Sequence, residues 1–163
     1  MNYELCIKSR EVLDDIRSGA WLEAELHPEL DRHRRHEMAD ICEKDNVERV
    51  WRVLGVAIAE IRLALQKILS PQCRVSLAND LERPESWQFS FLFPLPSSSV
   101  SYIREKIHEY LVAAVMADRT AVIIPPGAKI WQERASDAIA SLRNLASVSH
   151  PHLSGVVRPL WPL

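Results

Sequence analysis

The chain has 163 residues, of which 47% are hydrophobic and 26% charged, as expected for a single globular domain, 1–163, with a sizeable core. A net charge of −2 gives no general reason to expect a nucleic-acid partner or attraction to a membrane surface. The apolar runs are short and interrupted by charge, which argues against a membrane-spanning helix, and the first residues do not resemble a signal peptide. Three widely spaced cysteines suit a reducing cytoplasm, and two of them lie near apolar residues and should be buried and inert: Cys42 and Cys73.

The N-terminal part of the chain predicts a short strand followed by a helix. Residues 2–7 alternate weakly in polarity, as in an edge strand, and Ser9 can cap a helix that ends at His27-Pro28. The apolar stripe of this helix is expected to consist of Val12, Leu13, Ile16, Ala20 and Leu26. Residues 29–45 are densely charged and predict a partly ordered connector with a helical second half.

Apolar residues at steps of three and four predict a long central helix over 46–69, about 35 Å in length. Asp45 and Glu48 fit a capping box at its start, and Ser70-Pro71 ends it. Further apolar side chains widen the stripe, so we expect more than one neighbour to cover this helix: Trp51, Val53, Val56, Ala57 and Ala64.

A β-hairpin is predicted near 74–93. Residues 74–77 and 86–93 alternate in polarity, and the link between them is polar and contains a proline. One side of the second strand is aromatic, with Trp87, Phe89, Phe91 and Phe93. Such a face can stack nucleic-acid bases, but no basic groove accompanies it, so packing against the long helix is the favoured interpretation.

Two more helices are predicted after the hairpin. The first opens at 97–99, with a stripe from Val100 to Val115 and Val122 as a further candidate member. The second follows a break at 123–127 and includes Ile130 and Trp131 in its stripe. Helices joined by so short a break should pack antiparallel. The elements together predict a mainly α fold, roughly a four-helix bundle with a small β-hairpin as its minor β component.

The residues carry no signature of a metal, cofactor or catalytic site. His33, His36 and Glu37 form the densest polar cluster, but their spacing is not that of a helical zinc hydrolase, and a solvated face is expected. His150 and His152 flank a proline with no cysteine or carboxylate close by. We therefore expect no metal, no cofactor and no enzyme activity, although sequence alone leaves open a site assembled across the fold.

The segment 147–163 is predicted to be an extended C-terminal tail. Three prolines and a glycine there exclude regular secondary structure, yet the segment is rich in apolar residues. In a monomer, an exposed tail of this kind would leave apolar side chains in water and favour aggregation. The tail can therefore either fold over its own core or dock on a neighbouring subunit. The residues expected to make these contacts, named here the tail arm, are Val156, Val157, Arg158, Leu160, Trp161 and Leu163.

Several segments match the organisation of a known group of proteins: 9–16, 45–50, 108–118, 131–135, 142–143 and 157–160. In these segments the chain resembles small prophage-encoded virion structural proteins, similar to phage head–tail connector (adaptor) proteins. The resemblance implies a mostly helical, non-enzymatic protein without a cofactor that assembles as a ring between portal and tail. It also implies that the protein is cytoplasmic or part of the virion, and that its partners are copies of itself and portal or tail proteins.

Two other classes of protein remain as alternatives. A host protein-binding or regulatory helical module could use the hairpin or the charged connector to hold another protein. An enzyme with a dispersed site is the third class. Ring formation in solution separates the connector from both, and a deep pocket lined with converging titratable groups would favour the enzyme.

Overall fold

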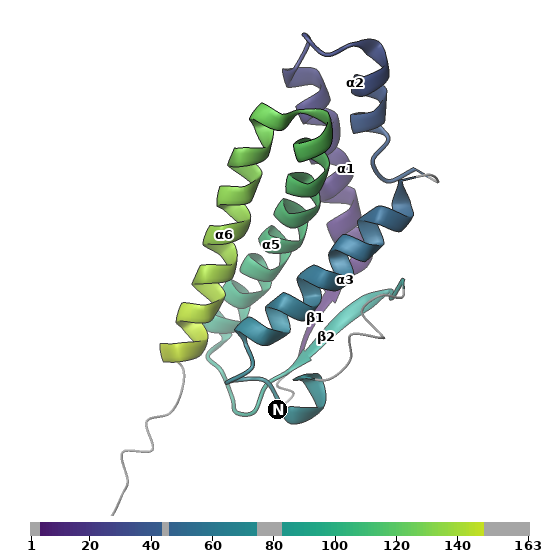
Figure 1. The fold of residues 1–163 in the computed structure, drawn as a ribbon. Coiled ribbons are helices and arrows are strands. Elements are labelled where there is room, and N and C mark those ends of the chain that lie inside the picture. The colour runs from purple at the N-terminus through teal and green to yellow at the C-terminus, as the bar shows by residue number, and fades with distance from the viewer. Residues whose placement is uncertain (1–3, 44–45, 75–82, 149–163) are drawn as a thin grey trace, which may run out of the picture.

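The computed structural model describes residues 4–43, 46–74 and 83–148, and its helices form one bundle that lies beside a small sheet (Figure 1). In chain order the elements are β1 (Glu4–Lys8), α1 (Ser9–Leu26), α2 (Arg32–Ala39), α3 (Val47–Ala64), the 3-10 helix η1 (Pro71–Arg74), β2 (Ser86–Ser90), α5 (Ser97–Ile123) and α6 (Pro125–Val148). The predicted mainly α fold with a minor β component is therefore confirmed.

Helix α1 follows β1 directly and runs without interruption through Gly19. Its buried face repeats every four residues, with Val12, Ile16, Ala20 and Ala24 against the core. Leu26 was expected in this stripe but is exposed, because it lies two residues, or about 200°, beyond Ala24 around the helix.

Gly19 is a position where the helix should accept a larger residue. A Cβ atom added there would lie 3.7 Å from Met116 Cε and 3.9 Å from Trp131 Cη2, both ordinary contact distances. We expect Gly19→Ala to raise the free energy of unfolding by about 0.5–1 kcal/mol, because alanine loses less backbone entropy in a helix interior. Urea unfolding followed by circular dichroism measures this change, and a lower unfolding midpoint would contradict it.

The charged connector contains a short helix, but the prediction of a helical second half is wrong, because α2 covers Arg32–Ala39 and the chain turns at 40–43. Helix α2 packs against α1. The side chains of Met38 and Ile41 in this region are fully buried in the core. The Asp31 carboxylate caps the helix by accepting a hydrogen bond from the Arg34 N–H at 2.8 Å.

Helix α3 is shorter than predicted, because it ends at Ala64 and not at Leu69. Leu65 and Ile68 follow in turns but are still fully buried, so the apolar spacing continues past the end of the helix. Asn46 occupies the N-cap position, and Asp45 of the predicted capping box lies outside the described residues.

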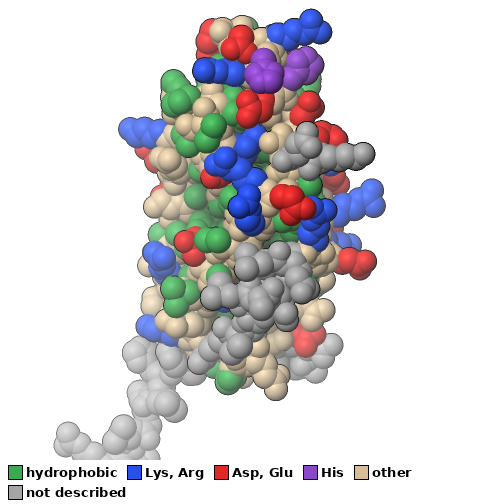
Figure 2. Space-filling model, turned by 45° about the vertical axis from the view of Figure 1, so that its right-hand side comes forward, with side chains coloured by type: hydrophobic (Ala, Val, Ile, Leu, Met, Phe, Trp, Pro, Cys, Tyr) green, Lys and Arg blue, Asp and Glu red, His purple; other side chains and the backbone are tan. Residues whose placement is uncertain are grey.

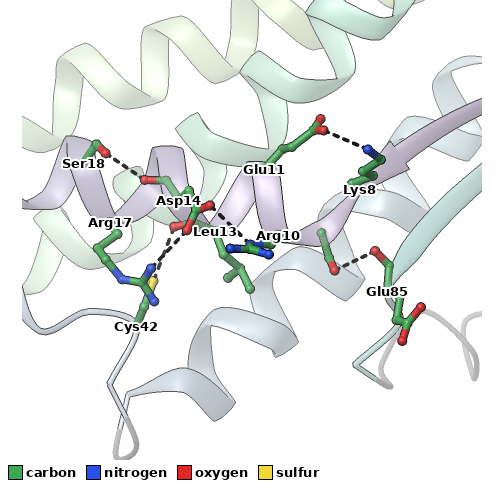
Figure 3. Close-up of polar contacts among 10 residues, drawn as sticks. Lys8, Arg10, Glu11, Leu13, Asp14, Arg17, Ser18, Cys42 and Glu85 are labelled. Atoms are coloured by element: carbon green, nitrogen blue, oxygen red, sulfur yellow. Dashed lines mark hydrogen bonds and ion pairs between the residues drawn. The ribbon is translucent and has the colours of Figure 1, made fainter.

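The sheet pairs the two strands from distant parts of the chain. β1 and β2 are antiparallel, with Leu5 opposite Phe89. The second predicted strand is thus present, and its partner is the N-terminal strand. Arg74, expected at the start of a hairpin strand, instead ends η1, and 75–77 lie outside the described residues. The Ser9 hydroxyl donates to the Glu85 carbonyl at 2.9 Å and ties the start of α1 to the chain just before β2 (Figure 3).

The aromatic face of β2 packs on α3, as the sequence favoured. The rings of Trp87 and Trp51 have centroids 6.1 Å apart, and Phe89 is fully buried with the Arg62 guanidinium 6.0 Å from its ring centroid. Base stacking on this face is therefore excluded by its burial.

Helices α5 and α6 are joined by Ile124 alone and lie side by side in opposite directions (Figure 1). This confirms the predicted antiparallel pair. Val122 and Ile130 are exposed, contrary to their expected places in the stripes. Ile130 lies twelve residues before the buried Leu142, which corresponds to about 120° around the helix.

Candidate functional site

A groove of about 480 Å³ lies between α3 and α5, where α3 crosses the bundle obliquely (Figure 1). The α3 residues that line the groove are three or four positions apart and so lie on one face of the helix: Arg49, Arg52, Val53, Val56, Ala57 and Glu60. Helix α5 contributes Ala114 and Asp118, which are four residues apart. The middle of the groove is therefore apolar, and charged groups stand at its two ends.

Val56 makes this groove unusual, because 54% of its surface is exposed. The wide apolar stripe of the sequence predicted that neighbours would cover α3 here, and for Val56 that prediction is wrong within the described part of the chain. Helix α3 runs obliquely to α5 (Figure 1), and the groove that Val56 lines lies between the two helices. The groove thus opens an apolar strip to solvent.

One end of the groove is closed by an ion pair between the helices. Arg49 donates to Asp118 through Nε at 2.7 Å and through an Nη at 2.9 Å. This two-point geometry is the strong form of the arginine–carboxylate contact. The hydrogen bond to Asp118 raises the pKa of Arg49 further above its ordinary value. The pair links α3 to α5 at this end of the groove.

The other end of the groove carries Glu60, and its Oε2 accepts a hydrogen bond from the Tyr110 hydroxyl. Burial, and then the hydrogen bond to the Glu60 carboxylate, raises the pKa of Tyr110 well above its usual range. Tyr110 therefore remains a neutral donor at physiological pH. Glu60 keeps its second carboxylate oxygen for other donors.

Arg119 lies below the surface near the Arg49 end, with only 4% of its surface exposed. Its guanidinium donates to Asn46 Oδ1 at 3.1 Å and stands 3.7 Å from the Glu37 carboxylate. Burial lowers the pKa of Arg119, and the neighbouring charge of Arg49 lowers it further. These contacts join α2, α3 and α5, so Arg119 holds elements together rather than facing a ligand.

A second groove of about 500 Å³ lies between α1 and α2. The exposed Trp21 lines it together with Arg32, Arg35 and His36, and Arg35 pairs with Glu25 at 3.3 Å. In Figure 2 the histidines visible on this face lie at the end of the molecule that carries α2, close to Lys and Arg side chains. An aromatic side chain beside arginines is a common composition of protein-binding surfaces.

The histidine cluster of α2 does not converge on one point. His33 and His36 are exposed, and Glu37 faces Arg119. Within residues 4–43, 46–74 and 83–148, no three His, Cys, Asp or Glu side chains are placed to hold a metal ion. His150 and His152 lie outside these ranges.

A third cleft, of about 520 Å³, lies between β1, α1 and α5 and is lined by Cys6, Ser101 and His108. His108 Nε2 lies 2.6 Å from Asp15 Oδ2, a contact that orients the imidazole. In the described structure no hydrogen bond joins Cys6 or Ser101 to His108. The cleft therefore has an oriented base without a nucleophile bonded to it.

The three cysteines differ in environment. Cys6 is exposed, whereas Cys42 and Cys73 are half-buried beside the core. The Cys42 thiol points at the Leu13 carbonyl oxygen, 3.9 Å away (Figure 3). Burial raises the pKa of Cys42, so less of it is thiolate at neutral pH.

We expect iodoacetamide to alkylate Cys6 at least about tenfold faster than Cys42 in the native protein, because only the exposed thiolate reacts readily. Peptide mass spectrometry at timed intervals measures both rates in one sample. Full unfolding in guanidinium is the control, and it should bring the two rates together. Equal rates in the native protein would contradict the burial of Cys42.

The residues of the tail arm lie outside the described residues, so their predicted contacts stay predictions. Helix α6 ends at Val148, so the first two residues of the predicted extended tail are helical and that prediction is wrong for 147–148. Sequence reasoning missed the groove between α3 and α5, although one signal was present. Val53 and Val56 extend the apolar pattern of α3 beyond the face that the core needs.

The fold and these grooves define a mainly helical bundle with open apolar surface. In comparisons with known proteins, no family model matches the chain, and no curated protein or solved structure shows significant similarity to it. Among the described helices, none is both long enough and apolar enough to cross a bilayer.

Proposed function

We propose that this protein is a non-enzymatic structural protein that acts by self-association, as a phage-type head–tail connector or a related virion component. Its partners would then be copies of itself and portal or tail proteins, in the cytoplasm or in the virion. One observation carries the proposal. Large apolar side chains on every long helix are more than half exposed: Trp21, Leu22, Leu26, Val56, Leu63, Val122, Ile130 and Val148.

Open apolar surface favours association, because burying it contributes about 25 cal/mol for each Å² removed from water. Single exposed apolar residues are ordinary, but here Leu22 and Leu26 lie one turn apart on α1, and Val56 lies in a groove beside Val53. The tail arm adds further apolar residues just beyond α6. A partner that covers these surfaces would remove the cost of leaving them in water.

Contacts between distant helices also suit an assembly role. The Arg49–Asp118 pair and the Arg119 contacts tie together helices that are distant in the sequence. A ring needs subunits that keep one shape, because small errors in angle accumulate around the closed assembly.

Light scattering after size-exclusion chromatography and negative-stain electron microscopy test the proposal. We expect a mass that is a multiple of 18.6 kDa, and closed ring-shaped particles. A particle of one subunit at every concentration, alone and with purified portal protein, would overturn the proposed function.

A host protein-binding or regulatory module is the second candidate, and the groove between α1 and α2 favours it. Trp and Arg are residues that often dominate binding energy, and both line this groove with Trp21 and Arg32. A single subunit in solution whose binding to a purified partner is lost in Trp21→Ala would favour this class over the connector.

A further inference from the structure

We propose that the groove between α3 and α5 is the acceptor site for the tail arm of a second copy of this chain. The inference rests on the proposed function, since it names the surface through which the copies join. The tail arm of one subunit would lie over Val53 and Val56 of the next, with Arg158 directed at Glu60.

The size and polarity of the groove fit a short extended segment. A volume of about 480 Å³ lies within the range of about 300–1,000 Å³ that is typical of ligand pockets, and it accommodates a few side chains. The strip along Val53, Val56 and Ala57 is apolar. The tail arm offers apolar residues on both sides of Arg158, so it can fill the strip while the charge reaches its edge.

Charge complementarity selects the orientation. Arg158 is the only Lys, Arg, Asp or Glu between 149 and 163. Of the two acidic groups in the groove, Asp118 is already paired with Arg49 through both oxygens. Glu60 uses Oε2 for Tyr110, and Oε1 has no hydrogen-bond partner among the described residues. Glu60 is therefore the acceptor that can receive a guanidinium.

The reach of the chain allows the contact. The C-terminal end of α6 lies near the C-terminal end of α3, and the two helices touch (Figure 1). The eight residues 149–156 can span at most about 26–29 Å when extended. That is close to the length of α3, about 27 Å for its 18 residues. From the end of α6, these residues can therefore carry the tail arm over a distance equal to the length of α3, and an adjacent subunit whose groove lies within that distance can receive it.

An arm on one surface and a groove on another make a head-to-tail contact. Such contacts close into rings when the rotation between subunits allows it. The groove thus supplies the geometry that the proposed function requires.

The main test compares two matched variants of the full chain. Val56→Glu places a charge in the groove, and Leu92→Glu places the same charge at a similarly exposed site outside it, in the chain just after β2, since 54% and 48% of these residues are exposed. We expect Val56→Glu to weaken self-association at least about tenfold in analytical ultracentrifugation, and Leu92→Glu to leave it unchanged. Circular dichroism confirms that both variants are folded.

The outcomes separate the site from the function. An oligomer unaffected by Val56→Glu would overturn the groove as the acceptor and leave the proposed function standing. An equal loss in both variants would also overturn the groove, because the effect would then not be local. A wild-type chain that is a single subunit would overturn the proposed function and the second copy as occupant together.

A crosslinking experiment checks the occupant directly. A photo-reactive amino acid replaces Trp161, and subunits labelled with ¹⁵N are mixed with unlabelled ones. We expect crosslinks to α3 that join a labelled to an unlabelled chain. Crosslinks only within one chain, or to other elements, would overturn the proposal. Arg158→Glu and Glu60→Arg should each weaken association, and their combination should restore it at least in part.

Discussion

Deletion of residues 154–163 is expected to convert the oligomer into a single subunit with an intact helical bundle. The deletion removes the whole tail arm, whereas α6 ends before it at Val148. A fully buried Val or Leu side chain contributes roughly 1.5–3 kcal/mol, so three of them contribute roughly 4–9 kcal/mol before ordering costs. A net loss of about 4 kcal/mol weakens association about a thousandfold. Light scattering measures the mass directly.

A control of equal length distinguishes the apolar side chains from the length of the tail. Val156, Val157, Leu160 and Trp161 are replaced by serine, and the chain keeps all its residues. If the apolar contacts hold the subunits together, this variant should behave like the deletion. An oligomer that survives either change would show that other surfaces join the subunits.

Leu54→Ala is expected to destabilise the fold most among single changes on α3. Leu54 is fully buried, at 0% exposure, in the hydrophobic core. Removing a buried leucine side chain costs about 2–5 kcal/mol, because the cavity closes only in part. A loss of about 3 kcal/mol lowers the melting temperature by roughly 6–12 °C for a chain of this size. Thermal and urea unfolding measure the effect.

Leu63→Ala on the same helix is the matched control, since 62% of Leu63 is exposed. We expect its free energy of unfolding to change by less than about 0.5 kcal/mol. Similar losses in both variants would mean that the buried face of α3 has been assigned wrongly.

Local patterns were sufficient to predict most helices. Helix α1 ends before His27-Pro28, and the α5–α6 pair is separated where Pro125 follows Ile124, as the residues indicate. These boundaries depend on residues close in sequence. The predicted cap at Ser9 is wrong, because Lys8 is the N-cap of α1 and the Ser9 hydroxyl donates to the Glu85 carbonyl. The end of α3 was predicted wrongly, because Leu65 and Ile68 are buried and continue the apolar spacing after the helix has ended.

The partner of β2 was beyond sequence reasoning. The alternation in 86–90 indicates a strand with one buried face, but it does not state which strand lies beside it. The nearest alternating run was the natural choice, whereas the structure uses β1 at the other end of the sequence.

The groove could not be predicted because it depends on the angle between α3 and α5. Contacts between these helices join residues far apart in the sequence, such as Arg49 and Asp118, which are 69 positions apart. Each of these residues resembles an ordinary surface charge in the sequence. Only the apolar excess on α3 pointed to an additional surface.

The pairing of β1 with β2 has a consequence for synthesis of the protein in the cell. Ser9 and Glu85, whose contact lies at the end of the sheet, are 76 residues apart. At about 5–20 residues per second, a ribosome needs roughly 4–15 s to make the intervening chain. During that interval Leu5 and Ile7 emerge without the strand that later covers them. The first strand would then be a site for transient chaperone binding on the nascent chain, which ends when β2 leaves the exit tunnel.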